Sequence, residues 1–159
     1  MLHWIFDLDL TLYQLPIGES FDYTRLRNDT QLKYLIKKLP FSRIMFTNGT
    51  VFHADTCIKK MNLQKCFHNV IARDSIQDLK PHQSAYQKFE VMNNINQEDK
   101  CVFFEDSIEN LIAAKDRGWI TVFIGPNTTR NMHESIDFYF PNIYVALNYF
   151  TSRIDNHLS

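Results

Sequence analysis

Short apolar runs alternate with amphipathic segments along this chain, and this alternation constrains the fold more than any other feature. The predicted strands are residues 2–6, 43–46, 69–72, 101–104, 120–124 and the short run 138–140. Between the strands, apolar residues recur at i, i+3, i+4 and i+7, as in the segment from Leu32 to Leu39, which predicts helices with one buried face. This order predicts an α/β fold with a mainly parallel sheet of five to six strands.

The composition fits one domain over residues 1–159, because 45% of the residues are apolar and 22% are charged. A net charge of -1 without a basic tail argues against a nucleic-acid partner, and no apolar run approaches the roughly 20 residues of a membrane span. The scattered Cys57, Cys66 and Cys101 predict buried free thiols in a reducing compartment. Strand-like sequence from the second residue leaves no room for a leader peptide, so we expect a cytoplasmic protein.

Polar residues follow most of the predicted strands. In open α/β sheets ligands bind beyond the carboxyl ends of the strands, so these residues are expected on one rim. The rim residues are Asp7, Asp9 and Thr11 after the first strand, Thr47, Asn48 and Gly49 after the second, Lys80 before the third helix, and Glu105 and Asp106 after the fourth strand. Four acids and a lysine that converge in this way predict a phosphate-handling site.

The two carboxylates of Asp7 and Asp9 repel each other and require a compensating charge. Together with Asp106 they offer hard oxygen ligands of the kind that Mg²⁺ prefers, and Lys80 supplies a second positive charge. With a cation present, one aspartate can attack a phosphate group and the other can transfer a proton.

Each of these motifs alone has a simpler structural interpretation. Asp-x-Asp is common in loops, Thr-Asn-Gly is an ordinary turn, and acids before a helix complement its dipole. Their order and common rim carry the functional interpretation. A receiver domain, which also phosphorylates an aspartate, is excluded because its acidic pair precedes its Asp, Thr and Lys.

The motifs resemble those of the haloacid dehalogenase-like superfamily, in the same order. The matching segments are FDLDLTLY at 6–13, IMFTNG at 44–49, LKP at 79–81 and FFEDSIEN at 103–110. The resemblance implies a three-layer Rossmann-like core and a Mg²⁺-dependent phosphomonoester hydrolase that forms an aspartyl-phosphate. In this family, a second aspartate at the position of Asp9 is typical of phosphatases and phosphotransferases and is absent from dehalogenases.

The resemblance assigns roles to the acidic residues. Asp7 corresponds to the nucleophile and to a Mg²⁺ ligand, and Asp9 to the general acid–base, whose backbone carbonyl is a further ligand. Asp106 corresponds to the second metal carboxylate, and Glu105 is expected to act through a metal-bound water. Thr11 corresponds to the residue that orients the loop.

The remaining motif residues are assigned to phosphate binding. Thr47 corresponds to the phosphate-binding hydroxyl, with the backbone N–H of Asn48 beside it and Gly49 in the same turn. Lys80 corresponds to the lysine that stabilises the phosphate and the nucleophile.

A large cap domain is absent from the sequence. Between the first two motifs lie only a flap, residues 12–27, and one core helix. Because TNGTVFHADTCIKKMNLQKCF and LKP look most like the pyrimidine-nucleotidase-like and small-phosphatase branches, we expect a small phosphometabolite or a nucleoside monophosphate as substrate. The open site leaves two alternatives: a phosphatase of a phosphoprotein or nucleic-acid phosphate end, and a non-catalytic phosphate-binding module. A neighbouring subunit of a homo-oligomer could also cover the site.

Aromatic residues of the flap, Tyr13, Phe21 and Tyr23, are open to two interpretations. They either anchor the flap on the core, which we favour, or stack on a base or sugar. His53 either faces the site or, as we favour, makes a local hydrogen bond at the start of a helix.

Overall fold

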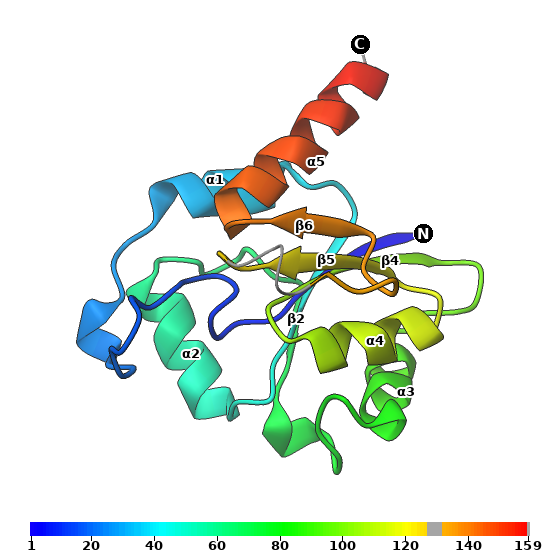
Figure 1. Ribbon diagram of the computed structural model, residues 1–159, viewed down its shortest axis with the longest axis horizontal. Helices are drawn as coiled ribbons and strands as arrows, with labels where there is room; N and C mark the ends of the chain where they lie inside the picture. The colour runs from blue at the N-terminus through cyan, green and yellow to red at the C-terminus, as the bar shows by residue number, and fades with distance from the viewer. Residues whose placement is uncertain (127–131, 159) are drawn as a thin grey trace.

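Six parallel strands form the central sheet of the computed structural model, which describes residues 1–126 and 132–158 (Figure 1). The strands are β1 (Leu2–Phe6), β2 (Ser42–Phe46), β3 (Asn69–Ile71), β4 (Lys100–Glu105), β5 (Ile120–Ile124) and β6 (Phe138–Phe140). Their order in the sheet is β3-β2-β1-β4-β5-β6, so β1 lies between β2 and β4. The predicted α/β fold with a parallel sheet is confirmed.

Helices cover both faces of this sheet and give the molecule three layers (Figure 1). The α-helices are α1 (Thr30–Lys38), α2 (Val51–Lys60), α3 (Gln83–Met92), α4 (Ile108–Asp116) and α5 (Ile143–Leu158), and the 3-10 turns are η1 (Tyr23–Arg25) and η2 (Arg73–Ser75). Helices α1, α2 and α5 share one hydrophobic cluster with the sheet, and α3 and α4 share the other. Both clusters follow from the alternation of side chains along each strand.

Strand β1 shows why the central strands are apolar throughout. Trp4 and Phe6 belong to the cluster under α1, α2 and α5, whereas Ile5 between them belongs to the cluster under α3 and α4. All three are buried, as a strand with helices on both sides requires. Because both faces of the sheet are buried, water reaches the strands only at their ends. The carboxyl end of β1 carries Asp7.

Helix boundaries mostly follow the expected capping chemistry. Asp29 caps α1 by accepting from the backbone N–H of Leu32, and Ser107 caps α4 by accepting from that of Asn110. Pro81 lies before helix α3 and not in its first turn. Helix α3 begins only at Gln83, and the preceding segment turns through a hydrogen bond from the backbone N–H of His82 to the carbonyl of Leu79.

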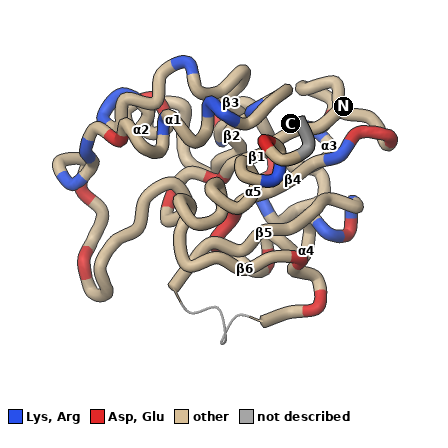
Figure 2. The backbone as a smooth tube through the Cα atoms, turned by 90° about the horizontal axis from the view of Figure 1, so that it is seen from above, with Lys and Arg blue, Asp and Glu red and all other residues tan. Residues whose placement is uncertain are grey.

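The part of the chain between β1 and α1 contains only loops and η1 within the described residues, so the prediction that no large cap is present is confirmed. The three cysteines are free and buried, as expected. Basic and acidic positions are interspersed along the backbone (Figure 2), in keeping with the net charge of -1. No helix in the described part of the chain is both long and apolar enough to cross a membrane.

Candidate active site

The loop after β1 holds Asp7 at the carboxyl edge of the sheet. The backbone N–H of Asp7 continues the strand pairing by donating to the carbonyl of Phe104. Leu8 is completely buried and accepts backbone hydrogen bonds from Thr11 and Leu12, which closes a tight turn. Leu10 completes this turn with a φ of 61°, a left-handed conformation. The turn therefore fixes Asp7 and Asp9 as part of one rigid loop.

Lys80 is the centre of a buried ionic cluster. Its Nζ lies 3.1 Å from Oδ1 of Asp7 and 2.9 Å from Oε2 of Glu105, and it also donates to the carbonyl of Phe46 at 2.6 Å. The rings of Phe46 and Phe103 lie 4.9 and 5.2 Å from Nζ and shield it from water. Burial lowers the pKa of Lys80, but the charges of Asp7 and Glu105 outweigh burial and raise it, so the ammonium is retained.

Thr11 connects the two aspartates that face each other across β1 and β4. Its hydroxyl lies 2.9 Å from Oδ2 of Asp7 and 3.1 Å from Oδ1 of Asp106. Burial raises the pKa of Asp7, but the charge of Lys80 and the hydrogen bonds lower it overall. Asp7 is therefore held as a carboxylate, although it is only 7% exposed.

The other two acids, Glu105 and Asp106, share a single buried ammonium with Asp7, so the three carboxyl groups outnumber the positive charge of Lys80. Burial and then the charge of Asp7 raise the pKa of Asp106 to about 6 and raise the pKa of Glu105 well above its usual range. Carboxylate oxygens of Asp7, Glu105 and Asp106 lie within 4.8 Å of one another. Three acids around one lysine form a site of excess negative charge built from hard oxygen donors, which fits a divalent cation.

Glu105 is held firmly by the protein itself. Its Oε1 accepts from the backbone N–H groups of Asp106 and Ser107, and its Oε2 accepts from Lys80 and from the side chain of Asn110. Both oxygens of Glu105 thus have protein partners, and the expected role through a metal-bound water stays a prediction.

The turn after β2 lies against the same cluster. Thr47 is 1% exposed, and its hydroxyl oxygen accepts from the backbone N–H of Gly49 at 3.0 Å, which leaves its hydroxyl hydrogen for another acceptor. The side chain of Asn48 exchanges two hydrogen bonds of 3.0 Å with the backbone of Lys80. Asn48 therefore positions the lysine with its side chain, while its backbone N–H is the predicted phosphate donor.

A family model described as haloacid dehalogenase-like hydrolase matches residues 16–118 of the 159. The chain belongs to this family. The motifs that contain Thr47, Lys80 and Asp106 lie inside the match, and Asp7 and Asp9 lie just before it.

Solved structures of haloacid dehalogenase-like proteins share the fold. A hydrolase from Pseudomonas syringae has a TM-score of 0.74 at 15% identity, covering 96% of this chain and 99% of that one. A protein from Thermotoga maritima assigned as a β-phosphoglucomutase has a TM-score of 0.75 at 15% identity, with the same coverage. The L-2-haloacid dehalogenase of Xanthobacter autotrophicus has a TM-score of 0.66 at 17% identity, over 80% of this chain and 62% of that one.

The present chain therefore spans less than two thirds of the length of the haloacid dehalogenase it matches. Because these neighbours include both a dehalogenase and a protein assigned as a phosphoglucomutase, the likeness to them shows the architecture alone and leaves the reaction and the substrate to the residues of the site.

His53 contacts both the start of its own helix and Asp9. The backbone N–H of His53 makes the expected local bond to the Thr50 hydroxyl, and Nε2 of its ring lies 2.6 Å from Oδ1 of Asp9. The Tyr13 hydroxyl donates to the same oxygen. The favoured interpretation, a local hydrogen bond at the start of a helix, is thus confirmed for the backbone of His53, and the alternative, that the residue faces the site, is confirmed for its side chain.

The aromatic residues of the flap pack together beside His53. Tyr13 and Tyr23 are partly buried against the hydrophobic core, which confirms the favoured anchoring interpretation for these two. Phe21 is 36% exposed and lies 5.6 Å from the Tyr13 ring, 5.0 Å from the Tyr23 ring and 5.3 Å from the His53 ring. The flap thus covers one side of Asp9.

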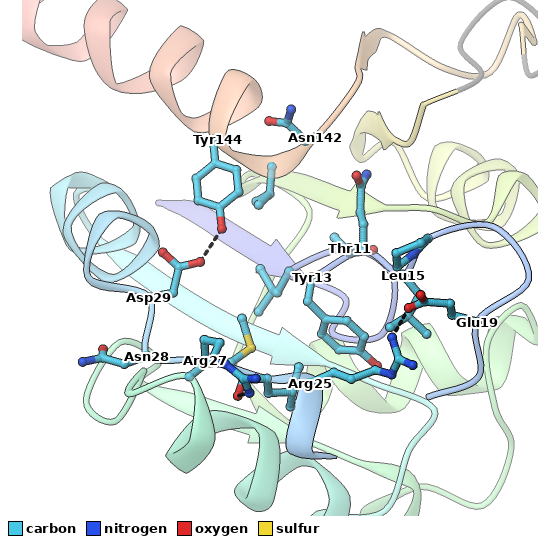
Figure 3. Close-up of a pocket in the computed structure, with 16 residues that line it drawn as sticks. Thr11, Tyr13, Leu15, Glu19, Arg25, Arg27, Asn28, Asp29, Asn142 and Tyr144 are labelled. Carbon is cyan, nitrogen blue, oxygen red and sulfur yellow. Dashed lines mark hydrogen bonds and ion pairs between the residues drawn. The ribbon is translucent and has the colours of Figure 1, made fainter. Parts of the chain in front are cut away.

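A pocket of about 450 Å³ lies on another side of the flap, between the flap and the starts of α1 and α5 (Figure 3). Arg25 is paired there with Glu19, and Tyr144 donates to Asp29. Thr11 lines this pocket, but none of Asp7, Asp9 or Asp106 does.

A smaller pocket, of about 260 Å³, adjoins the acidic cluster itself. It is lined by Leu10, Gln14, Leu15, Asp106, Phe123, Ile124, Gly125 and Pro126. Asp106 is the charged residue of this lining, and the rest is mainly apolar.

Proposed function

We propose that this haloacid dehalogenase-like hydrolase is a phosphomonoesterase that works through an aspartyl-phosphate on Asp7. The observation that supports this most directly is the buried contact of Lys80 with both Asp7 and Glu105, beside Asp106. An ionised Asp7 that is held at a rim with a cationic partner is suited to attack an electron-poor phosphorus.

In the first half-reaction, a carboxylate oxygen of Asp7 forms a bond to phosphorus while the bond to the ester oxygen breaks. Asp9 donates its proton to the departing oxygen. In the second half-reaction, Asp9 takes a proton from the water that attacks phosphorus, and the phosphate leaves Asp7. Asp9 is suited to both steps because its side chain is 38% exposed, whereas Asp7 is buried.

The proposed cofactor is Mg²⁺, held by the carboxylates of Asp7 and Asp106 and by the backbone carbonyl of Asp9. When bound, it would neutralise the negative charge of the phosphate oxygens that approach Asp7. Lys80 keeps Asp7 ionised and oriented, Thr11 holds its other oxygen, and Thr47 offers a hydroxyl to the phosphate.

We propose a small phosphorylated metabolite or nucleoside monophosphate as the substrate. The pocket beside Asp106 is below the usual range of about 300–1,000 Å³ for drug-sized ligands, which favours a small leaving group. The exposed side of Asp9 and the absence of a large cap support one alternative, a phosphorylated macromolecule that approaches from outside.

The experiment that tests this is a hydrolysis panel of phosphorylated metabolites, nucleoside monophosphates and phosphopeptides, with Mg²⁺ and with EDTA. We expect Mg²⁺-dependent phosphate release from a small ester, which is lost in Asp7→Asn. Release from phosphopeptides alone would favour the macromolecular alternative. If no ester is hydrolysed but phosphate binds, the protein is a phosphate-binding module and the proposal fails.

A further inference from the structure

We propose that His53 is a positioning residue for Asp9, which holds Oδ1 of that carboxyl group so that Oδ2 carries the transferred proton. This inference rests on the proposed phosphatase function and adds to it a residue to which the family resemblance assigns no role. The hydrogen bonds around Asp9 and the contacts between the flap and α2 support it.

The two oxygens of Asp9 have different surroundings. Within the described residues, the hydrogen bonds to this side chain both end on Oδ1, one from the Tyr13 hydroxyl and one from Nε2 of His53 at 2.6 Å. Oδ2 instead faces the turn after β2, where it lies 3.7 Å from the position that a Cβ on Gly49 would take. A carboxyl group held in this way presents Oδ2 to the site.

A protonated Asp9 fits this arrangement. A carboxyl group that carries its proton on Oδ2 has a carbonyl-type oxygen at Oδ1, which can accept both hydrogen bonds. When Oδ2 loses the proton to the departing ester oxygen, the same two donors stabilise the negative charge. The contacts are therefore compatible with both protonation states that the reaction requires.

Tyr23 holds the imidazole ring from its other side. Its hydroxyl lies 2.7 Å from Nδ1 of His53. A neutral His53 satisfies both contacts in a single tautomer, with the hydrogen on Nε2 donated to Asp9 and with Nδ1 accepting from Tyr23. The Cys57 sulfur, 3.7 Å from Nε2, packs beside the same edge of the ring.

The flap and helix α2 meet at this histidine. Tyr13 and Tyr23 come from the flap and its η1 turn, whereas His53 comes from the first turn of α2. Gly49 leaves room for the ring, because a Cβ there would lie only 3.0 Å from Cδ2 of His53. The orientation of Asp9 thus depends on contacts between two segments far apart in the sequence.

The dependence of the reaction on its leaving group tests this role. Nitrophenolate departs with little need of a proton, whereas the more basic phenolate benefits from one, so the two esters differ in their demand on Asp9. We would measure kcat/KM for 4-nitrophenyl phosphate and phenyl phosphate, which are close in shape, in the wild type, His53→Ala and His53→Gln.

In His53→Ala we expect kcat/KM for phenyl phosphate to fall about tenfold more than for 4-nitrophenyl phosphate, a fraction of what a general acid contributes. In His53→Gln, whose amide can donate to Oδ1, most of this additional loss for phenyl phosphate should disappear. Tyr23→Phe should show the same pattern more weakly, because the ring keeps its bond to Asp9. Asp55→Ala, on the exposed side of α2, is the matched control and should leave both esters unaffected.

Equal losses for the two esters in His53→Ala would overturn the inference, as would a His53→Gln variant that folds but recovers nothing. If circular dichroism shows that His53→Ala does not fold, His53→Gln and Tyr23→Phe are compared with the wild type instead. In that case, a Tyr23→Phe variant with the wild-type ratio of kcat/KM values for the two esters contradicts the proposal. A wild type that cleaves neither ester refutes the phosphatase function instead, which separates the two failures.

Discussion

Replacement of Lys80 by Met removes the one ammonium from a buried cluster while it retains the side-chain volume between two phenyl rings. The side chains of Lys80, Asp7 and Glu105 are 1%, 10% and 2% exposed. At separations of 3.1 and 2.9 Å, each pair is worth about 5 kcal/mol at an effective dielectric constant of about 20. Two effects offset part of this electrostatic energy: the cost of burying the Lys80 ammonium, and the uptake of protons by Asp7 and Glu105 once the ammonium is gone.

We therefore expect Lys80→Met to lower the free energy of unfolding by about 3–5 kcal/mol at pH 8, the range for breaking a buried ion pair by removing one partner. This corresponds to a fall in Tm of about 10 °C for a chain of this size. Urea and thermal denaturation in EDTA would measure it, with Lys88→Met on the exposed side of α3 as the control.

The sign of the pH dependence follows from the carboxyl groups. In the wild type, the pKa of Asp7 is lowered overall, so its contribution is present above the unfolded pKa and is lost as the pH falls. In the variant, both stranded acids have raised pKa values, so the folded state loses stability as the pH rises. The difference between the two proteins should widen from pH 5 to pH 8.

The double variant Lys80→Met/Glu105→Gln provides a second test. Removing the charge of Glu105 should offset part of the loss, so the double variant should be less destabilised than the sum of the single variants. A Lys80→Met protein within about 1 kcal/mol of the wild type at pH 8, or an equal difference at both pH values, would refute this description of the cluster.

Three further outcomes are expected. Asp7→Asn should remain folded by circular dichroism and show no turnover; measurable turnover would exclude Asp7 as the nucleophile. Because the pKa of Asp106 is raised to about 6, a proton competes with Mg²⁺ below that pH, and calorimetry should show weaker Mg²⁺ binding at pH 5 than at pH 7.5. In Gly49→Ala, the new Cβ would meet His53, and kcat/KM should fall about tenfold; unchanged kinetics would mean that the ring has room to move.

Much of the fold was predictable because a doubly covered sheet imposes a simple pattern. Both ends of the strand Ile120–Ile124 were predicted correctly, and the second strand was predicted to within one residue at each end. Such runs are recognisable because strands buried on two sides are apolar throughout. The convergence of Asp7, Lys80 and Asp106 also follows from the pattern, because parallel strands bring their carboxyl ends to one edge.

The contacts around Asp9 could not be predicted in the same way. Asp9 and His53 are 44 positions apart, and their hydrogen bond depends on the direction of a ring and on where the flap folds back. Periodicity identifies the buried face of a helix, but His53 lies in the first turn, where a capping residue is equally expected. The glycine at position 49, four residues earlier, leaves space for the ring of His53, and this role is interpretable only with the structure.

The flap has a consequence for protein engineering. It contains an exposed turn at Ile17 and Gly18, where Ile17 is fully exposed and Gly18 has a φ of 83°. No strand or helix passes through this turn, and exposed loop tips accept insertions at little cost in free energy. A foreign domain grafted between these two residues would leave the sheet and its buried lysine cluster intact. The chain is therefore a scaffold on which a recognition domain of chosen specificity could be mounted on the flap, beside the site.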